Sequence, residues 1–112
     1  MSARSTVHHT LAALGDQTRQ SVIDLLSHEP RRASDIAAAL GLTPQAMSRH
    51  LRVLRRSGLI VEEGVDDDAR VRIYRLRQEP FRDLRRWLDQ VESFWVDELS
   101  AFQQHVNQRA NK

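Results

Sequence analysis

Residues 44–56 constrain the fold more than any other segment, because their apolar and basic side chains separate onto opposite faces of a helix. Thr43 is a suitable N-cap, and Pro44 fits the first helical position, where a missing N–H costs no hydrogen bond. Gly58 marks the end of the segment. At about 100° per residue, the apolar side chains fall on one stripe that can be buried, which consists of Met47, Leu51 and Leu54.

The opposite face of this predicted helix is basic and carries no acid. Arginines three and four residues apart repel one another on a helix surface, whereas ordinary surface helices mix the two signs. An anionic partner would relieve this repulsion, and a face that is simply solvated is the alternative. The basic face comprises Gln45, Ser48, Arg49, Arg52, Arg55 and Arg56.

The charge of the chain is concentrated in one region. The net charge of all 112 residues is only +2, yet residues 31–58 carry six arginines and a single acid, Asp35. Lys112 is the only lysine in the chain. Arginine suits the recognition of phosphate and guanine, because its planar fork makes paired hydrogen bonds. A nearly neutral chain with one arginine-rich block therefore favours nucleic acid as the partner.

Turn-forming residues divide the chain before this segment into short helices. The spacing predicts one helix over residues 7–14, a second from Asp16 to about residue 28, and a third over residues 34–40 that Gly41 ends. A short helix, a tight turn and a capped basic helix together form a helix-turn-helix, which we place at about residues 34–57.

A short β-hairpin is predicted after the basic helix. The β-branched and aromatic runs at residues 59–61 and 71–74 flank a polar loop at residues 64–69. Arg70 and Arg72 alternate with apolar residues, so both project to one side of the second strand and can reach the minor groove or its phosphates. An exposed acidic turn that stays away from DNA is the alternative, because the loop tip carries Asp66, Asp67 and Asp68.

The last predicted helix, at about residues 80–106, carries two apolar lines. Steps of three and four residues separate its apolar positions, as in a coiled coil. These lines expose more apolar surface than a core of this size can cover, so we expect a second copy to cover them, with help from the first helix. The predicted dimer interface consists of Val7, Leu11, Leu88, Val91, Trp95, Leu99 and Phe102.

Together these elements predict a single domain over residues 1–112. The fold class is mainly α with a small β-hairpin: a winged helix-turn-helix, with a wing at about residues 59–76 and long N- and C-terminal dimerisation helices. No apolar run is long enough to span a bilayer, and the N-terminus lacks the layout of a secretion signal. We therefore expect a cytoplasmic protein without membrane contact.

Three stretches of the sequence resemble the ArsR-type winged-helix repressors. They are LGDQTRQSVIDLL at residues 14–26, DIAAALGLTPQAMSRHLRVLRRSGLI at residues 35–60, and RVRIYRL at residues 70–76. The resemblance implies a homodimer whose first and last helices form the interface. It also implies a recognition helix that enters the major groove of a palindromic operator. The positions that match DNA contacts of such repressors are Thr43, Gln45, Ser48, Arg49 and His50.

Four arginines complete the predicted DNA-binding set on the basis of their charge and position, and they are Arg52, Arg55, Arg70 and Arg72. For His50, which lies at the edge of the buried helix face, packing inside the protein and contact with a phosphate are equal alternatives.

No metal site, cofactor or catalytic centre is expected. The best-known thiolate site of the ArsR-type repressors requires cysteines in the third helix, and this chain has none. Their other common site uses carboxylates and histidines on the terminal helix, where this chain offers only His105, about two turns from Asp97. The sequence also lacks a glycine-rich phosphate loop and a nucleophile elbow, so an enzyme is not expected.

The sequence therefore predicts a sequence-specific DNA-binding transcriptional regulator, a homodimeric repressor that does not respond to metal. Two alternatives stay open: a metal-responsive repressor of the same fold, and a winged helix whose basic face binds another protein. If a small-molecule effector binds, the aromatic side chains of Trp87, Phe94 and Trp95 are the first place to seek its site.

Overall fold

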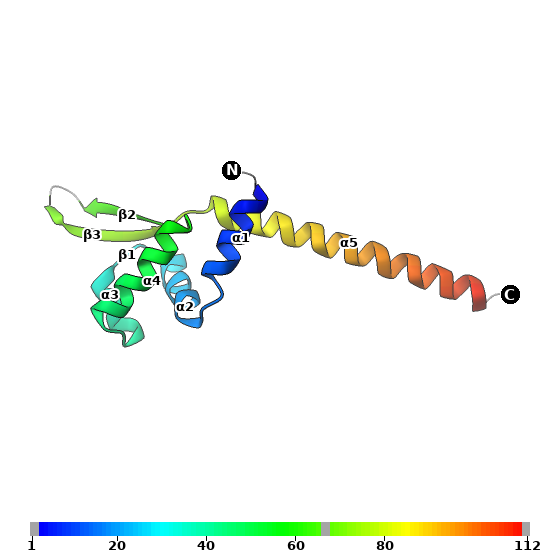
Figure 1. Ribbon diagram of the computed structural model, residues 1–112, viewed down its shortest axis with the longest axis horizontal. Helices are drawn as coiled ribbons and strands as arrows, with labels where there is room; N and C mark the ends of the chain where they lie inside the picture. The colour runs from blue at the N-terminus through cyan, green and yellow to red at the C-terminus, as the bar shows by residue number, and fades with distance from the viewer. Residues whose placement is uncertain (1–2, 66–67, 111–112) are drawn as a thin grey trace.

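A computed structural model of the protein describes residues 3–65 and 68–110. Helices dominate it, and a small antiparallel sheet projects to one side, which confirms the predicted fold class (Figure 1). In chain order the elements are α1 (Ala3–Ala13), α2 (Gln17–His28), β1 (Arg31–Arg32), α3 (Ala33–Leu40), α4 (Pro44–Arg56), β2 (Ile60–Val65), β3 (Asp68–Leu76) and α5 (Glu79–Ala110).

The predicted helix boundaries near α4 are confirmed because local side chains set them. Thr43 caps α4, and its hydroxyl accepts a hydrogen bond from the Ala46 N–H at 3.1 Å. Asp16 caps α2 in the same way, accepting from the Arg19 N–H at 3.0 Å. Gly41 ends α3 in the left-handed region, with φ at 65°, where a side chain would be strained.

The hydrophobic core lies where α2, α3 and α4 meet the base of the hairpin. The predicted apolar stripe of α4 is at its centre, since no member of the stripe is more than 3% exposed. Ile36 of α3 and Leu59, at the start of the hairpin, are fully buried beside it. This packing fixes the rotation of α4, so the opposite face of the helix must point to solvent.

The sheet contains one more strand than the sequence predicts. The strand order is β1-β3-β2, and all pairs are antiparallel. The two residues of β1 pair with Ile73 and Tyr74. The hairpin is also longer than expected, because β2 continues to Val65 and β3 begins at Asp68, so the predicted loop over residues 64–69 is wrong. Asp66 and Asp67, assigned to an acidic tip, lie outside the described residues, as does the side chain of Asp68.

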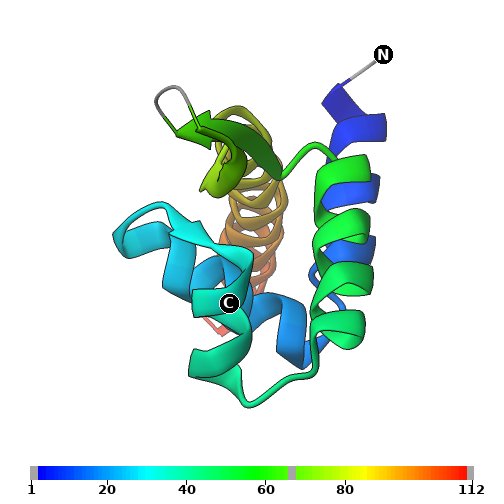
Figure 2. The ribbon, with the colours of Figure 1, turned by 90° about the vertical axis from the view of Figure 1, so that its left-hand side faces the viewer.

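Helix α5 extends far beyond the other elements (Figure 1), and the whole molecule measures 76 × 30 × 21 Å. Figure 2 looks nearly along α5, which recedes behind the other elements. Only its first turns lie against α1. Residues 88–109 are exposed without exception. The helix begins and ends outside the predicted 80–106 range, and within the described residues no helix is long and apolar enough to cross a membrane.

Candidate nucleic-acid interface

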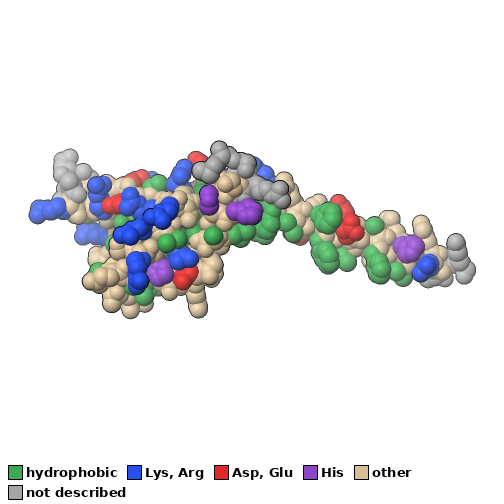
Figure 3. Space-filling model, viewed as in Figure 1, with side chains coloured by type: hydrophobic (Ala, Val, Ile, Leu, Met, Phe, Trp, Pro, Cys, Tyr) green, Lys and Arg blue, Asp and Glu red, His purple; other side chains and the backbone are tan. Residues whose placement is uncertain are grey.

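The solvent face of α4 presents the side chains that the sequence predicts for DNA contact. Gln45, Ser48, Arg49 and Arg52 are all exposed, and with Pro44 they line a shallow open hollow. Within the described part of the chain, neither Arg49 nor Arg52 forms an ion pair, so both guanidinium groups are available to a ligand. The Thr43 hydroxyl, in contrast, is already engaged as the α4 cap. Figure 3 shows the basic side chains gathered over α4 and the hairpin.

Two of the predicted DNA-binding arginines are held by an acid that the sequence reasoning missed. Glu62 Oε2 lies 2.9 Å from Arg55 Nη1, and Glu62 Oε1 lies 3.5 Å from Arg72 Nε. The Glu62 side chain is only 22% exposed, so solvent screens these contacts less than it screens a surface pair. Glu62 thus links α4 to the second strand of the hairpin.

Tyr74 lies directly opposite Glu62 in the sheet, and the Glu62 carboxylate affects the ionisation of its phenol. Burial raises the pKa of the Tyr74 phenol, and the negative charge of Glu62 and a hydrogen bond to it raise that pKa further. The sequence carries one signal for these contacts: alternation along a strand puts Arg70, Arg72 and Tyr74 on the same face of β3.

The hairpin arginines lie next to a third arginine from another element. Arg32 of β1 lines one open hollow of about 350 Å³ together with Arg70 and Arg72. The sequence reasoning missed Arg32, because its place depends on the pairing of β1 with β3. Arg70 and Arg72 do project to one side of the strand as predicted, and β1 enlarges their basic surface.

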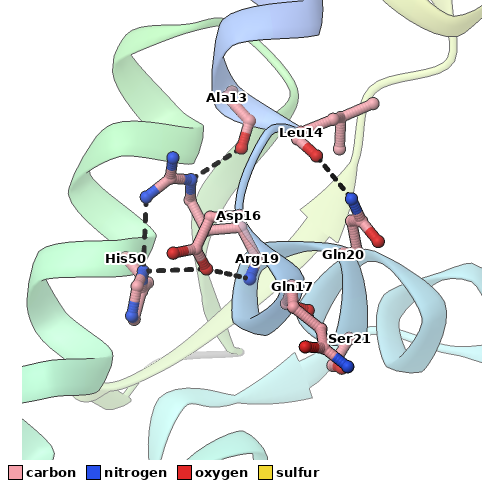
Figure 4. A network of polar contacts seen from close by, with 8 residues as sticks. All are labelled: Ala13, Leu14, Asp16, Gln17, Arg19, Gln20, Ser21 and His50. Atoms are coloured by element: carbon pink, nitrogen blue, oxygen red, sulfur yellow. Dashed lines mark hydrogen bonds and ion pairs between the residues drawn. The ribbon is translucent and has the colours of Figure 1, made fainter.

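His50 is held within the protein by residues at the start of α2 (Figure 4). Its Nδ1 atom lies 3.5 Å from Arg19 Nη1 and 4.0 Å from Asp16 Oδ1. Arg19 Nε in turn donates a hydrogen bond of 2.6 Å to the Ala13 carbonyl. Of the two alternatives for His50, packing within the protein therefore has direct contacts in its support, and the residue ties α4 to α2.

The same group of side chains affects the ionisation of Asp16. The Arg19 backbone N–H holds the pKa of the Asp16 carboxyl below its ordinary value, and the positive charges of Arg19 and His50 act in the same direction. Desolvation opposes these effects but does not outweigh them. The ionised cap is thus the form that this corner of the fold favours.

The residues assigned to a dimer interface are exposed, with one exception. Trp95 is 61% and Phe102 is 68% exposed. The other predicted positions on α5 are also exposed, and they are Leu88, Val91 and Leu99. Leu11 on α1 is 43% exposed, whereas Val7 is only 3% exposed in a single chain and has little surface left for a partner. We call the exposed apolar residues of α5 the α5 stripe. It comprises the predicted positions on α5 and three residues absent from the predicted interface, namely Phe94, Val96 and Val106.

The metal ligands considered from sequence are not brought together. Among the residues that the structure describes, no three His, Asp or Glu side chains are close enough to share a metal ion. His105 and Asp97 both lie on the exposed part of α5.

A helix-turn-helix with an exposed basic second helix, followed by a β-hairpin, defines the winged helix-turn-helix class of DNA-binding proteins. Residues 14–63 match a family described as a helix-turn-helix domain. The HTH-type transcriptional regulator Rv2034 of Mycobacterium tuberculosis is 28% identical over 107 residues, which cover 96% of this chain and 94% of the relative.

Solved structures that are similar to this chain are also transcriptional regulators. An ArsR-like transcriptional regulator from Rhodococcus sp. RHA1 has a TM-score of 0.78 and 28% identity, over 90% of this chain and 92% of that one. A possible transcriptional regulator for arsenical resistance is 34% identical over 82% of this chain and 90% of its own, with a TM-score of 0.63. The chain belongs to the ArsR-type winged helix-turn-helix transcriptional regulators.

One further structure is informative about assembly. The homodimeric winged helix-turn-helix DNA-binding domain of Mb0332 from Mycobacterium bovis, a possible ArsR-family regulator, has a TM-score of 0.61. It is 25% identical over 85% of this chain and 82% of that one.

Proposed function

We propose that this protein is a homodimeric repressor that binds a palindromic operator and does not depend on a metal ion for release. The observation that carries the proposal is the solvent face of α4, where Arg49 and Arg52 stand beside Gln45 without an acid. Arginine and glutamine read guanine and adenine through paired hydrogen bonds in the major groove. Packing of the opposite face in the core holds α4 in the orientation that such contact needs.

The α5 stripe supports a dimer. Its residues run along the part of α5 that its own chain does not cover, because residues 88–109 are all exposed. A twofold interface would bury the stripe of one copy against that of another. The Mb0332 domain, which is similar to this chain, is a homodimer. Dimers of the helix-turn-helix class bind two half-sites about one helical turn of DNA apart, so a twofold dimer of this chain would match a palindromic site.

The hairpin supports a second set of contacts on the DNA backbone. Arg32 and Arg70 line the same hollow, which Arg72 and Glu62 also line. Phosphate contacts made by such arginines position a protein on the duplex without reading sequence. Repression is the expected consequence when such a dimer occupies a promoter.

The proposal can be tested by sequencing the genomic DNA that co-purifies with the full-length protein and measuring the affinity for the recovered sites by fluorescence anisotropy. We expect one palindromic motif, a steep fall in affinity with salt, and lower transcription from a reporter promoter that carries the motif. If the recovered DNA shares no motif and affinity is independent of sequence, the basic face serves another partner, such as a protein.

A further inference from the structure

A cleft on the body of the molecule, away from the solvent face of α4, combines an apolar floor with a basic rim. Its volume is about 400 Å³, and it lies where α2, the end of β3 and the first turns of α5 meet. Half-buried Ile23, Leu76 and Phe81, one from each element, form the floor. Small-molecule sites of proteins have this size and this largely apolar lining with a few polar groups.

The rim of the cleft carries three arginines and, among the described residues that line it, no acid. Arg77 is partly neutralised by Glu79, whose Oε2 atom lies 3.4 Å from Arg77 Nη2. Arg82 donates to the neutral Gln78 side chain at 3.0 Å, and Arg85 has no ion-pair partner in the described part of the chain. Two positive charges therefore face an apolar surface without compensation.

The walls of the cleft are fixed by backbone contacts. The Arg77 N–H donates to the Leu59 carbonyl at 2.9 Å, which anchors the end of β3 to the base of the hairpin. The Arg82 N–H donates to the Gln78 carbonyl at 3.0 Å within the first turn of α5. Because these backbone hydrogen bonds fix the walls of the cleft, binding requires little ordering of the protein.

We propose that this cleft binds a small organic carboxylate, with its apolar body on Ile23, Leu76 and Phe81 and its carboxylate between Arg82 and Arg85. Charge complementarity selects this class: a neutral apolar molecule leaves both positive charges uncompensated, and an inorganic anion leaves the floor uncovered. The ligand would contact both the strand that carries Arg72 and the helix that carries the α5 stripe. Trp87, Phe94 and Trp95, where the sequence favours an effector site, do not line this cleft.

The proposal can be tested by NMR on the full-length 15N-labelled protein, titrated with 2-naphthoate and, separately, with neutral 2-naphthalenemethanol. We expect saturable shifts at residue 23 and at residues 76–79 and 81–85, with 2-naphthoate binding about tenfold more tightly because of its charge-assisted hydrogen bonds. Arg82→Gln and Arg85→Gln should each remove most of that preference. Both side chains are at the surface, so the variants should fold normally.

Arg86→Gln is the matched control, because Arg86 is the next residue on the same helix but lies outside the cleft, 3.8 Å from Asp83. It should leave the affinity for 2-naphthoate unchanged. Equal affinity for the two probes, or shifts confined to residues 88–109, would overturn the proposal. So would an absence of shifts with either probe, as expected if the arginine stems or a second copy of the chain cover the floor.

Discussion

Glu62 Oε2 lies 2.9 Å from Arg55 Nη1, so a carboxylate of the wing holds an arginine of the recognition helix. The other oxygen of the same carboxylate lies 3.5 Å from Arg72 of the second wing strand. Glu62 therefore occupies two guanidinium groups that the sequence alone assigns to DNA. Any DNA phosphate that approaches Arg55 or Arg72 must compete with it.

Glu62→Gln is expected to raise the affinity for DNA of any sequence and to narrow the difference between operator and non-operator DNA. The freed arginines can bind phosphates, so the slope of log affinity against log salt should become steeper by about 1–2. Anisotropy titrations over a range of salt concentrations measure this slope. Glu63→Gln is the matched control, since it removes the same charge from the wing but releases only Arg75. Equal slopes in the two variants would contradict the competition.

The same Glu62→Gln variant has a spectroscopic signature. Tyr74 is the only tyrosine, so its ionisation can be followed by the ultraviolet absorbance of the phenolate. Loss of the Glu62 charge should lower the Tyr74 pKa, although burial should still keep it above its ordinary value. Glu63→Gln should have little effect on the titration.

Arg49→Ala and Gln45→Ala are expected to weaken operator binding by about 5- to 150-fold, which corresponds to about 1–3 kcal/mol for a base contact. Both side chains point away from the core, so the thermal midpoint should stay nearly unchanged. Arg86→Ala, on α5, provides a control for the loss of one positive charge. Operator affinities like that of the parent protein would show that α4 does not read the bases.

Leu99→Asp, and to a lesser degree Trp95→Ala, should dissociate or unfold the protein and lower operator affinity with it. The reason is that each change removes apolar surface from the α5 stripe, and the aspartate also places a charge in it. Sedimentation and circular dichroism separate dissociation from unfolding. Asp97→Asn lies on the opposite side of α5 and should behave like the parent. A parent protein that is a folded monomer at micromolar concentration would refute the dimer.

Asp16 should make stability depend on pH in the acid range. Its pKa in the folded protein is below the ordinary value of 3.8, so its ionised form stabilises the fold. This contribution is present above about pH 4 and is lost as the pH falls through the lowered pKa. Asp16→Asn keeps an oxygen for the cap but removes the charge, so the gap in thermal midpoint between parent and variant should close at low pH. Asp24→Asn, on the exposed side of α2, is the control for the loss of one carboxylate from this helix.

Operator binding should be the same in EDTA and in a modest excess of zinc, nickel or cobalt. The chain has no thiolate, and α5 supplies one histidine per copy, which makes a poor ligand set for these ions. Anisotropy measures the affinity under each condition. A saturable loss of affinity that disappears in His105→Ala would establish the metal-responsive alternative.

Local chemistry explains which parts of the structure the sequence could predict. The bounds of α4 follow from Thr43, Pro44 and Gly58, and its buried stripe follows from spacing alone, because each of these signals acts within a few residues. The exposed α5 stripe is also readable, since its apolar steps exceed what the rest of a short chain can cover.

Contacts between distant residues explain what was missed. The strand β1 has only two residues, so it has no period of its own and exists only by pairing with Ile73 and Tyr74. His50 contacts Arg19, which is 31 positions away in the chain, and Asp16, which is 34 positions away. Glu62 follows the same pattern, because its two arginines belong to different elements. Charge and face could be predicted for these side chains, but their partners could not.

The length of α5 has a consequence for how long the protein survives in a cell. At about 1.5 Å per residue, its 32 residues reach about 48 Å, and an isolated helix in water is only marginally stable. If a second copy supplies the missing support, the folded fraction rises with the amount of protein present. At protein concentrations below the dissociation constant of the dimer, the exposed part of α5 would fray and become a substrate for proteases. The half-life of such a regulator would then depend on its own copy number. Transcription of a gene that it represses would resume soon after synthesis of the regulator stops.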